Sequence, residues 1–488
     1  MEMKSSSQAL IQQAKEKINE MKLLVANDPY RLDYHIMPPV GLLNDPNGFV
    51  YFNGYYHLFY QWNPFATTHG AKFWGHVFSK DLVHWHQAEI ALAPDQWYDK
   101  NGCYSGSAIV NKEKLYLFYT GNVKNEQGER ESYQCLAISE DGIHFEKQGP
   151  IIHVPNGYTG HFRDPKVFRK DNTWYMVLGA QTMEKKGQVV LYTSPDLREW
   201  NFQGPIAGSD VGELYDFGYM WECPDLFQLN GADLLLVCPQ GLSPQGMLYQ
   251  NIFQSGYFAG EVDWKQHTFS HGDFVEMDRG FDFYAAQTTE APDGRRLLVG
   301  WMGNAEEIGS IQPTENNGWI HCLTLPRVLE WKSGRLIQKP VKELEKLRQE
   351  EVRHVAVVVT EDELLLPKVH GSVFEVKVDV HAFQAKEFSI HFGESSFHYN
   401  IEKKIATFTR LKFSGEGKEI RQCTLEELES IRIFKDTSSV EIFLNDGEEV
   451  FTSRVFHDLN REEIYFHAEE GQVKLDVTKW NLKKVTEY

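Results

Sequence analysis

Three acidic residues of this chain occupy similar places in a faint internal repeat. Asp45 lies in the motif Leu-Asn-Asp-Pro-Asn-Gly, Asp164 in Phe-Arg-Asp-Pro and Glu222 in Trp-Glu-Cys-Pro-Asp. By eye, each acid precedes by the same number of residues an apolar anchor within a run that resembles a buried strand; these anchors are Phe59, Leu178 and Leu236. If the repeats are equivalent structural units, the three carboxylates converge around one axis.

Converging carboxylates can cleave a glycosidic bond. One ionised carboxylate attacks the anomeric carbon or activates water, and a protonated carboxyl donates its proton to the leaving oxygen. A third can hold sugar hydroxyls. An Asp followed by Pro is often only a turn residue. Three acids at matching places favour catalysis over three coincidental turns.

The same repeat indicates the elements that position these acids. Apolar anchors recur roughly every sixty residues, and several short strands fit in each unit, which is the signature of propeller blades. The first three units close with Ser-x-Asp-x-x-x-aromatic, which we interpret as a turn before a blade-edge strand. Five units predict five blades, with anchors at Phe59, Phe118, Leu178, Leu236 and Val299.

The rest of the chain predicts two further parts of an all-β protein. Residues 1–29 contain an amphipathic stretch, 5–24, that we expect to form a short helix packed outside the main domain. The propeller is predicted over residues 30–340 and a charged linker over 341–354. Residues 355–488 lose the repeat and alternate apolar and polar positions, which predicts a C-terminal β-sandwich.

Composition excludes several classes of partner. The formal net charge of −20 argues against nucleic acid and anionic membrane surfaces. No run approaches the ~18 apolar residues of a membrane span, and the polar N-terminus has no signal-peptide pattern. The six cysteines lack zinc-type spacing, and we expect reduced thiols in a cytoplasmic protein, with no metal and no cofactor.

The three acidic motifs resemble those of the invertase family, glycoside hydrolase family 32. The resemblance spans most of the chain and includes the stretches 74–76, 104–107, 282–284 and 436–443. It implies a five-bladed propeller with a sandwich and retaining hydrolysis of β-fructofuranosides. It also implies that Asp45 is the nucleophile, Glu222 the acid/base and Asp164 the transition-state stabiliser. Glu222 should then carry the raised pKa while Asp45 stays ionised.

The resemblance further implies a small sugar substrate: sucrose, sucrose 6-phosphate or short fructans. The expected contacts are Leu43, Asn44, Gln61, Trp74, Tyr104, Ser105, Arg163, Asp282 and Tyr284. Trp74 could equally be core. A cytoplasmic location favours the phosphorylated sugar, for which His69 and Lys72 are possible phosphate contacts, although both also fit ordinary surface residues.

Three other functions stay open at this level. A fructan hydrolase of the same family would share every motif. An inverting, arabinanase-like propeller also uses three acids, but it would not explain these motifs or the sandwich. A non-catalytic sugar-binding propeller would not need a complete acid trio. The sequence leaves the oligomeric state open.

Overall fold

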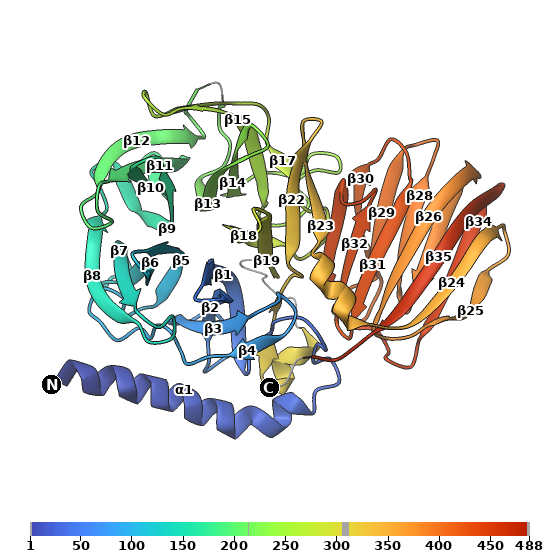
Figure 1. Ribbon diagram of the computed structural model, residues 1–488, viewed down its shortest axis with the longest axis horizontal. Helices are drawn as coiled ribbons and strands as arrows, with labels where there is room; N and C mark the ends of the chain where they lie inside the picture. The colour runs from blue at the N-terminus through green and yellow to red at the C-terminus, as the bar shows by residue number, and fades with distance from the viewer. Residues whose placement is uncertain (1, 213, 305–311, 486–488) are drawn as a thin grey trace.

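The computed structural model describes residues 2–212, 214–304 and 312–485, and strands dominate it (Figure 1). The all-β prediction, with a propeller followed by a sandwich, is confirmed at this level. A ring of sheets occupies one half of the molecule and two large sheets occupy the other. Over the described residues, no helix has the length and apolar character needed to cross a membrane.

Five sheets of four or five strands form the ring in the part of the chain that the structure describes. The first contains β20 (Trp319–Ile320), β1 (Gly41–Phe52), β2 (Tyr55–Asn63), β3 (Phe73–Ser79) and β4 (Trp85–Gln87). The second contains β5 (Cys103–Asn111), β6 (Lys114–Lys124), β7 (Arg130–Ser139) and β8 (Glu146–His153). The third contains β9 (Tyr158–Lys170), β10 (Thr173–Thr182), β11 (Gly187–Ser194) and β12 (Asn201–Gly208).

The remaining two sheets of the ring are slightly more complex. The fourth contains β13 (Met220–Leu229), β14 (Ala232–Gln240), β15 (Gly256–Asp263) and β16 (Thr268–His271), with β17 (Val275–Glu276) also paired to β15. The fifth contains β18 (Tyr284–Glu290), β19 (Arg296–Met302), β22 (Arg327–Lys332) and β23 (Arg335–Pro340), with β21 (Cys322–Leu323) paired to β19.

The first strands of the five sheets line the centre of the ring. Strand β1 contacts β5, β5 contacts β9, β9 contacts β13, β13 contacts β18, and β18 contacts β1. The ring is also tied by hydrogen bonds, because β20 pairs in parallel with the start of β1, Gly41 opposite Trp319. The second strands, such as β2 and β14, are buried along almost their whole length. Their near-continuous apolar sequence reflects this burial on both faces.

Helix α1 (Glu2–Ala26) lies along the outside of the ring (Figure 1). It extends a few residues beyond the predicted 5–24. Ala14 and Val25 are buried in the same apolar cluster as blade residues, and Ile11, Ile18 and Met21 pack against that cluster. The amphipathic pattern therefore gives the helix the expected role of packing on the main domain.

Two six-stranded sheets form the sandwich among the described residues. One contains β24 (Arg348–Val359), β35 (Gln472–Leu482), β26 (Phe374–Gln384), β31 (Ser430–Asp436), β32 (Ser439–Leu444) and β33 (Glu449–Arg454). The other contains β25 (Leu364–His370), β34 (Glu463–Glu469), β27 (Glu387–Phe392), β28 (Ser395–Asn400), β29 (Ile405–Leu411) and β30 (Lys418–Thr424).

The linker region differs in detail from the prediction of 341–354. A short 3-10 helix, η2 (Lys342–Leu347), follows the ring, as the charged helical pattern suggested. Strand β24 then begins at Arg348, inside the predicted linker. This strand pairs with β35 from its first residue, Arg348, which lies opposite Leu482. Its sequence is polar because much of the strand is exposed. A second 3-10 helix, η1, spans Pro313–Asn317.

Buried charged side chains join the ring to the sandwich. Arg327 is fully buried and pairs with Asp278 at 3.1 Å and with Glu441 of β32 at 2.7 Å. His35, just before β1, lies 2.8 Å from a carboxylate oxygen of Asp436 and 3.2 Å from one of Glu441. Buried ion pairs of this kind fix relative orientation, because removing one partner strands the other charge. All six cysteines are buried and free.

Candidate active site

Each of the five first strands departs from regular pairing at its site-facing end. The register of β1 shifts between Leu43 and Pro46, and that of β9 shifts around Asp164. Comparable shifts occur in β5, β13 and β18. A bulge bends a strand and re-aims its side chains. The predicted catalytic acids therefore lie where the sheets are irregular, which is why their motifs contain Pro and Gly.

The structural register corrects one detail of the sequence alignment. Glu222 pairs with Cys238, as Arg163 pairs with Gly179 and Tyr284 with Trp301. Glu222 is thus equivalent to Arg163, and Cys223 is the counterpart of Asp164; both have positive φ, 50° and 68°. The alignment by eye was wrong by one residue for Glu222, because Val237, and not its apolar neighbour Leu236, is the counterpart of Leu178. In β1 the same register position belongs to Leu43, so Asp45 lies one residue beyond the counterpart of Asp164.

The carboxylate of Asp45 accepts hydrogen bonds from three neighbouring side chains. Asn44 Nδ2 donates to Oδ1 at 3.1 Å, Gln61 Nε2 donates to Oδ2 at 3.3 Å, and Ser105 Oγ donates to Oδ2. Gln61 also donates to Ser105, and Asn44 to Gln61. Four of the predicted site residues therefore form one hydrogen-bonded group at the ends of β1, β2 and β5.

Asp164 faces Asp45 across the thiol of Cys223. The Cys223 Sγ atom lies 3.8 Å from Asp45 Oδ2 and 3.7 Å from Asp164 Oδ2. The backbone N–H of Cys223 also donates to Asp164 Oδ2 at 3.0 Å. A hydrogen bond to Cys238, burial and the two nearby acids all raise the pKa of this thiol. Cys223 is thus a neutral buried spacer, and this role was not evident from its sequence context.

Glu222 is held by three donors. Arg163 Nε donates to Oε1 at 2.8 Å and its Nη2 lies 2.7 Å from the same atom. Gln240 Nε2 and Tyr284 Oη each donate to Oε2 at 2.7 Å. Gln240 was missed by the sequence analysis; it follows an apolar strand, and no motif marks it. Glu222, Arg163 and Tyr284 occupy equivalent positions on three first strands.

The protonation pattern is the reverse of the one expected. Burial raises the pKa of Glu222, but the Arg163 guanidinium and the Tyr284 hydroxyl outweigh burial and leave it lowered. Burial and the Glu222 charge raise the pKa of Asp164 to about 7. Burial also raises the pKa of Asp45, against the hydrogen bond from Ser105. The expectation of a raised Glu222 pKa overlooked Arg163 as its direct partner.

Lys72 is buried beside this group. Its side chain is only 2% exposed, and within the described residues its ammonium has no hydrogen-bond partner. Burial lowers the pKa of Lys72 to about 7, and the Asp45 carboxylate partly offsets that shift. His69, the other suggested phosphate contact, is exposed in the loop after β2, with its ring 6.4 Å from that of Trp301.

Three predicted sugar contacts are placed elsewhere or are buried. Asp282 is fully buried and its carboxylate accepts hydrogen bonds from Arg410 and from the backbone N–H of Arg454, both in the sandwich. It joins the two domains instead of lining the acid trio. Leu43 is fully buried in the apolar core. Trp74 is also fully buried, and its indole N–H donates to the Tyr104 carbonyl at 3.1 Å, so it supports Tyr104 from behind.

Arg130 is a neighbour that the sequence analysis did not single out. Its guanidinium lies 5.2 Å from the centre of the Tyr104 ring. It is close enough to help lower the pKa of Glu222. It starts β7 and therefore belongs to the second sheet, outside the first-strand pattern that drew attention to the acids. Within the described residues, no group of His, Cys, Asp and Glu is arranged to hold a metal ion.

Comparisons with known proteins identify the family of the chain. The model for the glycosyl hydrolases family 32 N-terminal domain matches residues 35–340, and the family 32 C-terminal model matches 343–483. A Bacillus subtilis sucrose-6-phosphate hydrolase is 48% identical over 98% of this chain and 100% of its own length.

Two solved structures extend the match to the whole fold. A sucrose-6-phosphate hydrolase from Lactobacillus gasseri superposes with a TM-score of 0.87 at 34% identity, covering 97% of both chains. A variant of a Bombyx mori GH32 β-fructofuranosidase, solved in complex with sucrose, gives a TM-score of 0.85 at 35% identity, covering 98% of this chain and 99% of its own. The chain belongs to glycosyl hydrolases family 32.

Proposed function

We propose that this protein is a retaining β-fructofuranosidase that hydrolyses sucrose 6-phosphate and sucrose. The observation that carries the proposal is the grouping of Asp45, Asp164 and Glu222 from three separate sheets, each within a set of hydrogen-bond donors. Relatives named sucrose-6-phosphate hydrolase, the first of them 48% identical over almost the full length, support the substrate. Fructan hydrolysis is the alternative within the family.

In this proposal Asp45 is the nucleophile that forms a fructosyl-enzyme. Its hydrogen bonds from Asn44, Gln61 and Ser105 hold the carboxylate in one orientation toward the sugar. Glu222 donates a proton to the leaving oxygen and then removes one from the attacking water. We expect the two carboxyl groups to lie roughly 5–5.5 Å apart, as in retaining enzymes.

Glu222 can act as an acid only if its proton affinity rises when the sugar enters. In the free protein the proton belongs to Asp164, whose pKa is about 7, while Glu222 is ionised beside Arg163. We propose that Arg163 transfers hydrogen bonds from Glu222 to sugar hydroxyls. Glu222 then loses its cationic partner and takes up the proton. Asp164, once ionised, can stabilise the positive charge that develops on the fructosyl ring.

We further propose that the phosphate of the substrate contacts Arg130, with His69 as a second contact. The leaving sugar must lie next to its acid, Glu222, and Arg130 is a second cation on that side besides Arg163. Lys72 was the other sequence candidate. Its position beside Asp45 favours contact with the fructosyl unit, because Asp45 attacks that ring.

Two architectural proposals accompany the function. We propose that the five sheets are the five blades of one propeller, with domain limits near 30–340 and 355–488 except that the sandwich starts with β24. We also propose that the enzyme works in the cytoplasm, where six buried thiols remain reduced. Full activity in the presence of a reductant would support this placement, because it shows that the enzyme needs no disulfide.

The deciding experiment compares sucrose, sucrose 6-phosphate and inulin as substrates of the purified protein. Hydrolysis of both sucrose forms with retention is expected. Inulin as the best substrate would favour the fructan alternative. Arg130→Gln should lower kcat/KM for sucrose 6-phosphate about tenfold or more, the value of a charged hydrogen bond, and change it little for sucrose. Equal losses on both substrates would exclude Arg130 as the phosphate contact.

Variants of the acids test their roles. Asp45→Ala should abolish turnover on every substrate. Glu222→Ala should fail on sucrose, whose leaving sugar needs a proton, yet still release a good leaving group and accumulate fructosyl-enzyme. Azide needs no base and should then restore turnover. Equal losses on both substrate types without azide rescue would assign the acid/base role to another residue.

A further inference from the structure

A second pocket lies at the opposite ends of the strands that carry the acids. It has a volume of about 600 Å³ and is lined by the final residues of β1, β5, β9, β13 and β18. Asp164 and Lys166 share β9, and Glu222 and Phe227 share β13. Because a strand rises about 3.3 Å per residue, Lys166 lies roughly 7 Å along β9 from Asp164, and Lys170, at the far end of the pocket, lies roughly 20 Å from it. The proposed hydrolysis makes no use of it.

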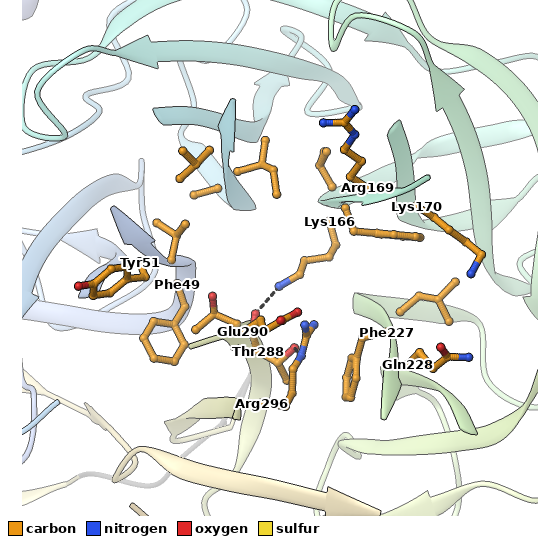
Figure 2. A pocket seen from close by; sticks show the side chains of 18 of the residues that line it. Phe49, Tyr51, Lys166, Arg169, Lys170, Phe227, Gln228, Thr288, Glu290 and Arg296 are labelled. Atoms are coloured by element: carbon orange, nitrogen blue, oxygen red, sulfur yellow. Dashed lines mark hydrogen bonds between the residues drawn. The ribbon is translucent and has the colours of Figure 1, made fainter. Parts of the chain in front are cut away.

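Two cations point toward the same place in this pocket, near Thr288 (Figure 2). The Lys166 ammonium donates to the Thr288 carbonyl at 2.6 Å and lies 3.0 Å from Asp225 Oδ2. Arg296 donates from Nε to Thr288 Oγ1 at 2.8 Å and lies 3.5 Å from Asp225 Oδ1. Both cations therefore share the single carboxylate of Asp225, which is itself buried.

These partners leave donors unused. An ammonium has three N–H donors and a guanidinium has five. Among the described residues, the contacts above use two N–H donors of Lys166 and two of Arg296. Burial lowers the pKa of both side chains. A pair of cations with one shared counter-charge and free donors facing a cavity is complementary to an anion.

The surrounding residues add to this character. Arg169 and Lys170 also line the pocket, and the lining acids are Asp233 and Glu290. Asp233 is already bonded to the backbone N–H of Val262 at 2.8 Å. When Asp225 is counted with the lining residues, the pocket has four cationic and three anionic side chains. The whole chain, in contrast, has a net charge of −20. This local excess of positive charge stands out against the acidic protein.

We propose that this pocket binds the phosphoryl group of a small phosphorylated metabolite, at a site separate from the acid trio. The dianionic group lies between Lys166 and Arg296, where a guanidinium fork and an ammonium can bond several of its oxygens. The ring of Phe227, stacked 4.2 Å from the Arg296 guanidinium, offers an apolar wall for the remainder of the ligand. The volume is sufficient for a hexose phosphate.

Calorimetric titration with inorganic phosphate and with glucose 6-phosphate tests the proposal. The titrations use Asp45→Ala saturated with sucrose, which keeps the acid trio occupied without turnover. Adding Arg296→Gln should weaken phosphate binding about tenfold or more, the effect of losing a charged hydrogen bond. Arg296→Lys, which keeps the charge, should retain most of the affinity. Arg198→Gln, an exposed arginine outside the pocket, is the matched control and should bind as the parent does.

The result also identifies the source of the phosphoryl group. Glucose 6-phosphate binding at least about tenfold tighter than phosphate would identify a sugar phosphate, and equal affinities would identify the free ion. In the otherwise unmodified enzyme, Arg296→Gln should leave kcat/KM for sucrose unchanged when phosphate is absent. Equal phosphate affinity with and without Arg296→Gln, or no binding to the sucrose-saturated protein, would overturn the proposal.

Amide exchange of the wild-type protein supplies a test that needs no variant. Saturating phosphate should slow exchange around Thr288 and Arg296, which belong to the proposed anion site. Protection confined to the backbone around Asp45, Ser105 and Glu222 would place the anion at the acid trio and contradict a second site.

Discussion

Replacing Arg163 by Gln should move the pH dependence of catalysis upward. The Arg163 guanidinium lies 2.7–2.8 Å from Glu222 Oε1, and its side chain is largely buried. An opposite charge at this distance lowers a carboxyl pKa by about 1–3 units. Its loss should therefore raise the pKa of Glu222 by about that amount, equivalent to roughly 1.4–4 kcal/mol in the free energy of ionisation. Arg163 also lowers the pKa of Asp164, so both shifts have the same sign.

The assay is the pH dependence of kcat/KM for sucrose, which reports groups of the free enzyme. In the wild type, the basic limb should fall near pH 7, where the proton shared by the acids is lost. In Arg163→Gln the limb should lie at least about one pH unit higher, even though the maximal rate falls. Arg198→Gln, an exposed control, should leave the limb in place. An unchanged limb in Arg163→Gln would refute the idea that this cation sets the protonation of the trio.

Three further outcomes are expected. Asp282→Asn should cost about 1.5–3 kcal/mol in the free energy of unfolding, because the buried Arg410 loses one of its two carboxylate partners and keeps Glu419; urea denaturation measures this, and a loss below about 1 kcal/mol would contradict the buried pair. His35, whose pKa is raised by its two carboxylate partners against burial, stabilises the fold fully below about pH 6.5 and progressively less as pH rises through its folded pKa. The difference in the free energy of unfolding between wild type and His35→Gln should therefore shrink as pH rises. A difference that grows with pH would contradict a raised pKa for His35. Tyr284→Phe removes a hydrogen bond to Glu222 and should raise its pKa, which carboxyl infrared spectroscopy can detect; an unchanged carboxyl signal would contradict the contact.

The sequence pattern predicted the elements better than the contacts between them. The repeat was sufficient for the ring of sheets and for bringing the acid motifs to one end of it, because equivalent strands place equivalent segments at one level. It misplaced Glu222 by one residue, since neighbouring apolar residues such as Leu236 and Val237 look alike as anchors in a strand buried on both faces. The lowered pKa of Glu222 depends on Arg163 from another sheet, and a partner distant in sequence has no local signal.

Asp282 shows the same limit of sequence analysis, because the sequence predicted a sugar contact where the structure has a contact between domains. It lies two residues before Tyr284, the counterpart of Glu222, yet its partner Arg410 belongs to the sandwich. A buried acid looks the same in sequence whether it faces a substrate or a neighbouring domain. Lys72 was weighed as an ordinary surface residue, but it is buried, because the loop that contains it folds back over Gly102.

The pairing of β20 with β1 has a consequence for biosynthesis. Strand β1 carries Asp45, and its parallel neighbour Trp319 is made only after three further sheets and two strands of the fifth. Until then the nascent ring has an open edge, exposed to pairing with other chains. Contacts of such large sequence separation also form slowly. Asp45 therefore reaches its final surroundings late, and chaperone demand during synthesis should fall once the chain has passed residue 340, where the fifth sheet ends.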